Sequence, residues 1–348
     1  MTGQLIVSLH KTRLELTTPP GDFLTFARSY LAPLLDQPGT QPDIKVALEW
    51  DATLPRKYFP LEKLGRRVWV TDHYLRYDEI WQAPGLQMGI DWEDTLTVQA
   101  TYDWPSQRAK WFSRIINSAQ KKLFVLLIYY LIYFPCAWWL EHKMGWTLMH
   151  ASAIATPKGG LIFSGLPGCG KSTTAMASLS QSMWQVVSDN LLFTDGSKVF
   201  ACPEPIHVDK ETRALVGDLG QRVRPTGREF SHRRQDYEVA PQARQQSTTP
   251  RALGFLHLGE ETSVRPIDTT TATRRLMAND YLAKEWMAYQ ESAATMHQLW
   301  AQIGDQEQRR ENLISLASLV PCYKVTVAKG ENVRQAMEAI AGAMLHGR

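Results

Sequence analysis

Hydrophobic and polar residues alternate over much of the first hundred positions, a pattern typical of strands with one buried face. Four stretches predict strands in this way: QLIVSLHKTRLEL (4–16), DIKVALEW (43–50), RRVWVTDHYLRY (66–77) and DTLTVQATYDW (94–104). DFLTFARSYLAPLL (22–35) instead spaces its apolar residues as an amphipathic helix does, with Asp22 as the expected N-cap. We therefore expect a small, mostly antiparallel α+β region over residues 1–105.

A helical region is predicted over residues 106–143, with Pro135 as its break. Within it, LFVLLIYYLIYFPCAWWL (Leu123–Leu140) has no charge over 18 residues, which reaches the lower limit for a membrane-spanning helix. The segment is short for a span, Pro135 interrupts it, and its tyrosines lie in the middle rather than at the ends. A buried core helix is the better interpretation, and a membrane-associated protein is the alternative.

The second half of the chain alternates strand and helix patterns, which predicts a domain with a mixed sheet over residues 106–348. Apolar runs on both sides of TPKGG (156–160) predict a hairpin, and LLFTDGSKVFA (191–201) predicts a second one. Further strands are expected at WQVVS (184–188), ALGFLHLG (252–259) and CYKVTVA (322–328), and helices at KSTTAMASLSQ (171–181), within Thr271–Leu319 and at NVRQAMEAIAGAML (332–345).

Residues 217–252 form a polar, basic stretch without periodicity, which predicts a mobile segment or lid. A solvated linker is an equal alternative. Arginines in this stretch could reach a phosphate group if the segment closed over a bound nucleotide. They are Arg222, Arg224, Arg228, Arg233 and Arg234.

Composition adds limits on partners and location. The 348 residues carry a formal net charge of +3, with 44% hydrophobic and 21% charged residues, which is ordinary for a soluble globular protein. This balance predicts neither nucleic acid nor a membrane surface as partner. The 4 cysteines form no CxxC pair and the first residues lack a secretory pattern, so we expect a reduced, cytoplasmic location. The composition leaves homo-oligomerisation open.

The most specific motif is GLPGCGKST (165–173), which matches G-x-x-x-x-G-K-[ST] between an apolar strand and a helix. Its glycines allow successive backbone N–H groups to converge on phosphate oxygens at the N-terminus of the helix. Lys171 is expected at the β and γ phosphates, and the Ser172 hydroxyl at Mg²⁺. The expected nucleotide-binding residues are Gly165, Gly168, Cys169, Gly170, Lys171, Ser172 and Thr173. Cys169 is either a small filler residue or, as the less favoured alternative, a redox-sensitive thiol.

Two companions of this loop give it possible chemistry. Asp189 follows Lys171 by one helix, one turn and one strand, which predicts that it lies at a strand end close to the phosphates. A carboxylate there can hold Mg²⁺ or accept a proton from an attacking hydroxyl; its alternative role is to cap a turn. His150 begins the strand that pairs with the strand before the loop. A neutral His150 would hydrogen-bond a phosphate, and a protonated one would stabilise charge; a structural histidine is equally compatible.

These linked pieces resemble the core of HPr kinase/phosphorylase and its relatives. The resemblance rests on HASA (150–153), the hairpin into SGLPGCGKST (164–173) and VVSDN (186–190). It implies a fold like phosphoenolpyruvate carboxykinase and phosphorylation of a serine hydroxyl in a protein or peptide, or of a small molecule. It also implies that Lys171 and Ser172 bind nucleotide and Mg²⁺, that Asp189 is the base or a metal-side carboxylate, and that His150 belongs to the active site. A packed helix at 123–140 is implied as well.

One position departs from that family. True HPr kinases have a second acid where this chain has Asn190, which can offer Mg²⁺ a carbonyl oxygen but no charge. The chain also has no match to the later HPr-binding signature, so HPr itself is not the expected substrate.

The sequence thus predicts a kinase that depends on Mg²⁺ and on ATP or another nucleoside triphosphate. Asp189, His150 and Lys171 are its expected catalytic residues, and Ser172, Asp189 and Asn190 its expected metal ligands. The alternative is a nucleotide-gated binding module with little or no phosphotransfer. Three softer candidates on CPEPIHVDKETR (202–213) are His207, Lys210 and Arg213.

Overall fold

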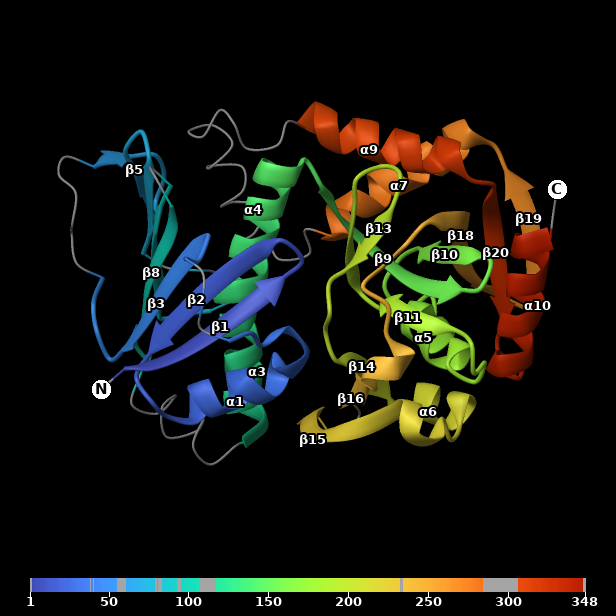
Figure 1. Ribbon diagram of the computed structural model, residues 1–348, viewed down its shortest axis with the longest axis horizontal. Helices are drawn as coiled ribbons and strands as arrows, with labels where there is room; N and C mark the ends of the chain where they lie inside the picture. The colour runs from blue at the N-terminus through green and yellow to red at the C-terminus, as the bar shows by residue number, and fades with distance from the viewer. Residues whose placement is uncertain are drawn as a thin grey trace. The chain divides into compact units, whose positions relative to one another are not determined.

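The computed structural model describes residues 2–37, 39, 41–54, 61–78, 80, 83–92, 95–104, 106, 117–231, 234–283 and 306–346 (Figure 1). Contacts divide the chain into two compact units. Unit 1 is Met1–Met144 with Lys284–Gly304, and unit 2 is Gly145–Ala283 with Asp305–Arg348. The division thus falls at Met144, whereas the sequence placed it at residue 105, because the helical segment before Met144 contacts the strands of unit 1.

Unit 1 is built on an eight-stranded sheet of order β1-β2-β3-β8-β7-β6-β5-β4. The pairs β2–β3 and β3–β8 are parallel, so the region is larger and more mixed than the sequence predicted. Its strands are β1 (Gly3–Leu9), β2 (Thr12–Thr18), β3 (Ile44–Trp50), β4 (Glu62–Lys63), β5 (Val68–Val70), β6 (Tyr74–Tyr77), β7 (Leu86–Asp91) and β8 (Leu96–Tyr102).

Three predictions for unit 1 need correction at their turns. Residues 66–77 form the antiparallel hairpin β5–β6 rather than one strand. Residues 4–16 form a hairpin rather than one strand, because the chain reverses at His10, whose φ is 56°. Helix α1 (Asp22–Tyr30) has Gly21 as its N-cap, and Asp22 instead lies in the first turn, where its charge suits the helix dipole. A short 3₁₀ turn η1 (Ala32–Leu34) follows α1.

The apolar segment forms α3 (Asn117–Ile128), a π-helical turn η2 (Tyr129–Tyr133) and α4 (Phe134–Met144). Pro135 therefore does not break the helix as predicted; the wider π turn lies just before it and accommodates the missing N–H. Among the described residues, one helix, Ala119–Met144, is long and apolar enough to cross a membrane, and 78% of its most apolar window is buried. Phe124 packs 5.5 Å from the rings of Phe23 and Phe26, which is the behaviour expected of a core helix.

Unit 2 contains a nine-stranded mixed sheet of order β17-β13-β12-β9-β10-β18-β20-β19, with β11 also paired to β9. The predicted hairpin is confirmed as β9 and β10, and β10 continues into parallel pairs with β18 and then β20. The strands are β9 (Thr147–Thr156), β10 (Gly159–Ser164), β11 (Gln185–Ser188), β12 (Leu191–Thr194), β13 (Val199–Ala201), β17 (Ser247–Thr248), β18 (Pro250–Gly259), β19 (Ser263–Ile267) and β20 (Cys322–Ala328).

Helices cover both faces of this sheet. Leu161 and Phe163 of β10 pack in one buried cluster with α5 (Lys171–Ser178) and α10 (Val333–His346). Ile162, between them, packs in a second cluster with α7 (Thr269–Ala283) and α9 (Gln306–Leu319). Successive strand residues point to opposite faces, so this alternation produces a three-layer unit. The part of the predicted helical stretch between α7 and α9, residues 284–305, lies outside the described residues.

The sequence predicted a stretch without regular structure over residues 217–252, but this stretch contains strands. A three-stranded sheet of order β14-β16-β15 uses β15 (Val223–Ser231) and β16 (Arg234–Val239) from this stretch and β14 (Ile206–Asp209) from before it. Helix α6 (Lys210–Val216) and the short turns η3 (Gly220–Arg222) and η4 (Pro241–Ala243) flank these strands.

Candidate functional site

The motif loop joins the end of β10 to the start of α5. Gly170 is the N-cap of α5. Its backbone is left-handed, with φ 99°, a conformation that residues other than glycine rarely adopt. At Gly165 an added Cβ would lie 2.8 Å from Cys169 Sγ and 3.0 Å from the Leu256 carbonyl oxygen. Both glycines are therefore needed for the loop to pass between β18 and the helix start. The loop places the N-terminal N–H groups of α5 beside Lys171 and Ser172.

The ammonium group of Lys171 lies over the first part of the loop. Its Nζ donates to the carbonyl oxygens of Gly165, at 2.9 Å, and Leu166, at 3.1 Å. The side chain is buried, so its charge acts strongly on the groups around it.

Asp189 reaches the same edge of the sheet as the loop. Strands β10 and β11 are both antiparallel to β9, so they run in the same direction and their carboxyl ends lie at one edge. Asp189 directly follows β11, and the Ser172 side chain lies close enough to its carboxylate to lower the pKa of that group. Its Oδ1 atom is buried and has no hydrogen-bond partner among the described residues. Burial raises the pKa of Asp189 to about 6, although the Ser172 side chain and the charges of His207 and Lys171 oppose the shift.

His150 also lies at this edge. The hairpin register pairs Ser164, the last residue of β10, with Ala151, so His150 stands beside the start of the loop. Its imidazole is buried, and its Nε2 has no hydrogen-bond partner among the described residues. Burial, together with the nearby Lys171 charge, lowers the pKa of His150 to about 4. A pKa this low favours the neutral imidazole among the two forms that the sequence left open.

A histidine–carboxylate pair faces Asp189 from the neighbouring sheet. His207 on β14 and Asp236 on β16 are cross-strand partners, and His207 Nδ1 lies 2.6 Å from Asp236 Oδ1. Burial alone lowers the pKa of His207, but the hydrogen bond to Asp236 and the charges of Asp236, Glu204 and Asp189 raise it overall. The sequence named His207 only as a softer candidate and missed Asp236 and Glu204; no local motif marks either acid.

Strand β14 is tied to the motif loop by the start of α6. Asp209 caps α6 by accepting a 2.7 Å hydrogen bond from the Thr212 N–H. The Thr212 hydroxyl lies 3.1 Å from that of Thr173, the second residue after Lys171. These contacts hold the His207–Asp236 pair beside the helix that begins at Lys171.

The donor set suits a hard divalent cation shared with a nucleotide. The described residues contain no cluster of three or more His, Cys, Asp or Glu side chains able to enclose a metal. The unpartnered, buried Oδ1 of Asp189 and the Ser172 hydroxyl instead offer two oxygens, and Mg²⁺ typically takes its remaining ligands from phosphates and water. Asn190 directs its amide nitrogen to Glu204 Oε2, at 3.5 Å.

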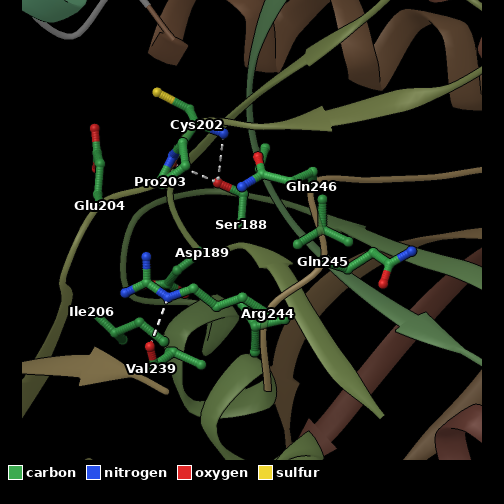
Figure 2. Close-up of a pocket in the computed structure, with 13 residues that line it drawn as sticks. Ser188, Asp189, Cys202, Pro203, Glu204, Ile206, Val239, Arg244, Gln245 and Gln246 are labelled. Atoms are coloured by element: carbon green, nitrogen blue, oxygen red, sulfur yellow. Dashed lines mark hydrogen bonds between the residues drawn. The ribbon is translucent and has the colours of Figure 1, made fainter. Parts of the chain in front are cut away.

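A hollow of about 20 Å³ lies directly beside Asp189 (Figure 2). Figure 2 shows Arg244 extending across it, with Nε donating a 2.7 Å hydrogen bond to the carbonyl of Val239. On the opposite wall, the Ser188 hydroxyl lies 3.0 Å from the Cys202 carbonyl. A space of this size holds a water molecule and nothing larger, so a substrate has to approach Asp189 from elsewhere.

Several softer candidates have structural roles. Arg222 does not face the loop: its guanidinium donates to the carbonyls of Leu179, at 3.0 Å, Gln181 and Trp184, which follow α5. Arg224 pairs with Glu238 at 2.8 Å. Lys210 and Arg213 line a separate hollow of about 690 Å³ next to α6.

The other arginines of the basic stretch are not placed by the structure. Arg233 lies outside the described residues, and the side chains of Arg228 and Arg234 lie outside the described side chains.

Cys169 is buried, and burial raises the pKa of its thiol. Both properties favour the filler role over a redox-sensitive thiol, because the reactive form is an exposed thiolate.

Comparisons with known proteins give little beyond this geometry. No family model and no curated protein matches the chain. Among solved structures, the HPr(Ser) kinase/phosphatase from Coxiella burnetii is similar over 56% of this chain and 93% of its own, with 11% sequence identity and a TM-score of 0.27. A match of that extent assigns neither a family nor an activity to the chain.

Proposed function

We propose that this protein is a Mg²⁺- and ATP-dependent kinase that transfers the γ-phosphoryl group to a hydroxyl, with serine of a protein or peptide, or a small molecule, as acceptor. The observation that carries the proposal is the position of Asp189. Its carboxylate lies beside Ser172 and in the field of Lys171, and it keeps one buried oxygen without a hydrogen-bond partner among the described residues.

The loop would bind the phosphates. Its glycines keep the backbone N–H groups turned toward a common point, and the α5 N-terminus adds a positive dipole. Lys171, held over Gly165 and Leu166, would exchange its bonds to these carbonyls for the β and γ phosphate oxygens. These fixed charges would stabilise the negative charge of the transferring group.

Ser172 and Asp189 would hold Mg²⁺, and Asn190 is a neutral neighbour of this pair. When bound, the cation supplies charge neutralisation between the β and γ phosphates. Because Asn190 adds no charge, the protein contributes one carboxylate rather than two from this strand end.

Asp189 would also act on the acceptor. In the cation-free site its pKa is about 6, so it is ionised at pH 7 yet more basic than an ordinary aspartate. A carboxylate tuned toward neutrality is well matched to accept a proton from a hydroxyl during attack.

The two histidines would have different tasks. His150, neutral at pH 7, would offer a hydrogen bond to a phosphate oxygen without adding charge. His207, whose pKa is raised by its hydrogen bond to Asp236, would favour the ionised form of the Asp189 carboxylate.

The proposal is tested by incubating the full chain with γ-labelled ATP, Mg²⁺, a pool of serine peptides and a pool of small hydroxyl compounds. Mass spectrometry then locates the label. We expect it on a hydroxyl oxygen, and we expect Lys171→Ala to abolish transfer while Lys198→Ala, at an exposed lysine, has no effect. Nucleotide binding without labelled product in either pool would favour a nucleotide-gated binding module instead.

A further inference from the structure

A further cavity borders the motif loop on the side of β18. Its volume is about 380 Å³, within the usual range for small-ligand pockets. Loop residues Gly165–Cys169 form one wall, and the end of β18 with one side of α7 forms the other. Its lining is mainly apolar, with Arg275, Asn279 and His257 as the polar groups.

The position of Lys171 fixes which end of a nucleotide would meet this cavity. In loops of this type the lysine reaches the β and γ phosphates. Here its ammonium lies on the carbonyls of Gly165 and Leu166, and these two residues border the cavity. The cavity therefore adjoins the transferable end of the phosphate chain, and the nucleoside extends the other way.

Hydrogen bonds connect the cavity with the edge of the sheet where the motif loop and His150 lie. Asn279 Nδ2 donates to Ser164 Oγ at 2.8 Å, and Ser164 Oγ lies 3.5 Å from the carbonyl oxygen of His150. Asn279, in the cavity wall, thus contacts Ser164. Ser164 directly precedes the motif loop and lies beside the backbone of His150.

The lining also indicates what would bind. Leu166 and Leu258 are 64% and 49% exposed and so offer apolar surface to a ligand at the cavity. Arg275 lies over the Phe255 ring, 5.6 Å from its centroid, and 3.3 Å from His257 Nε2. Among the described residues, no carboxylate forms an ion pair with Arg275. A partly buried guanidinium of this kind is suited to a carboxylate of a ligand.

From this geometry we infer that the cavity is the acceptor site of the proposed kinase, a conclusion that rests on the proposed function. It takes a hydroxyl compound with an apolar group between Leu166 and Leu258 and a carboxylate on Arg275. The hydroxyl then lies next to the γ phosphate, which is transferred as the oxygen–phosphorus bond to ADP breaks and the new bond to the acceptor oxygen forms. The hydroxyl proton passes to the proposed base, Asp189, which is not part of the cavity lining, so the hydroxyl has to project past the loop toward the end of β11.

Two variants test the assignment. Ala278→Trp fills the cavity from an exposed position on α7, and Arg275→Gln removes the charge. The matched control is Ala339→Trp, at an exposed position on α10 outside the cavity. ATP and inorganic triphosphate binding are measured by calorimetry. Transfer of γ-label is measured to two pools: serine peptides with leucine and glutamate neighbours, and small hydroxy acids.

The acceptor site predicts that both variants bind ATP within about twofold of the wild type but lose at least about tenfold in transfer. The pool that is labelled by the wild type identifies the source of the acceptor. A tenfold loss of ATP affinity in Ala278→Trp, with triphosphate binding unchanged, would assign the cavity to the nucleoside and overturn the inference. So would unchanged transfer in both variants. Absence of label in both pools while the wild type binds ATP would instead refute the proposed function. Failure of the wild type to bind either ATP or triphosphate would refute the proposed function itself.

Discussion

Replacing Asp189 with asparagine should make the protein more stable and less active. The raised pKa of Asp189, about 6 against an ordinary 3.8, means that the folded chain holds this proton more tightly than the unfolded chain does. Stability is therefore lost as the pH rises from about 4 to about 6, and the penalty is constant above that range. The difference corresponds to about 3 kcal/mol at pH 7.5. Asp189→Asn keeps the shape and removes the charge, so it should recover up to that amount.

The assay is scanning calorimetry of the full chain at pH 7.5 and pH 4. The transition of unit 2 is recognised by its shift on adding inorganic triphosphate, since a ligand of the folded state raises its melting temperature. We expect a higher Tm for Asp189→Asn at pH 7.5 and a difference of less than about 1 kcal/mol at pH 4. Glu260→Gln, at an exposed carboxylate after β18, should change neither value.

The same variant should retain ATP binding and lose transfer by about 10²- to 10⁴-fold, the usual contribution of a general base. A Tm at pH 7.5 equal to or below that of the wild type would show that the ionised Asp189 carboxylate does not destabilise the folded protein. Full transfer by the variant would refute its role as the base.

Three further changes probe the surroundings of the site. His207→Gln removes the electrostatic effect by which His207 lowers the pKa of Asp189, so the pH at which transfer reaches half its maximum should move upward; an unchanged pH profile would exclude this coupling. Arg222→Ala removes the donors to the carbonyls that follow α5, and chemical denaturation should show a loss of about 1–3 kcal/mol with ATP affinity retained; a change in affinity alone would contradict the structural role. Gly165→Ala places a Cβ against Cys169 and the Leu256 carbonyl, so ATP binding should weaken strongly by calorimetry, whereas Gly342→Ala, in open space on α10, should bind normally; equal binding by both would show that the loop adapts.

The core of the candidate site could be predicted because its signals are local. The loop motif, the hairpin that places His150 beside it and the short path to Asp189 all lie within about one strand–helix–strand unit. Strand direction then determines that the ends of β10 and β11 share an edge. The burial of each side chain could not be predicted from the sequence. Burial is the main cause of the lowered pKa of His150 and of the raised pKa of Asp189.

The His207–Asp236 pair could not be predicted from local sequence patterns, because the pairing of β14 with β16 brings together two residues that are distant in the sequence. Strand β15 was also difficult to predict. Its register with β16 shifts between Pro225 and Glu229, and such an irregularity interrupts the alternation of inward and outward side chains that is typical of a strand. That irregularity made 217–252 resemble a loop in sequence.

In unit 1, the reversal at His10 was missed for a related reason. The turn contains no Gly, Pro or Asn, and buried residues continue on both sides of it. Apolar spacing likewise could not reveal the π turn before Pro135, because all five of its residues are buried.

The most direct test of the central claim is the rate of single-turnover transfer from γ-labelled ATP to a hydroxyl acceptor between pH 5 and pH 8. If Asp189 is the base and keeps its raised pKa of about 6 in the loaded site, the rate should rise about tenfold per pH unit below that pKa and level off above it. The label should lie on the acceptor oxygen. A rate that is independent of pH across this range, or label that appears only as free phosphate, would contradict the account.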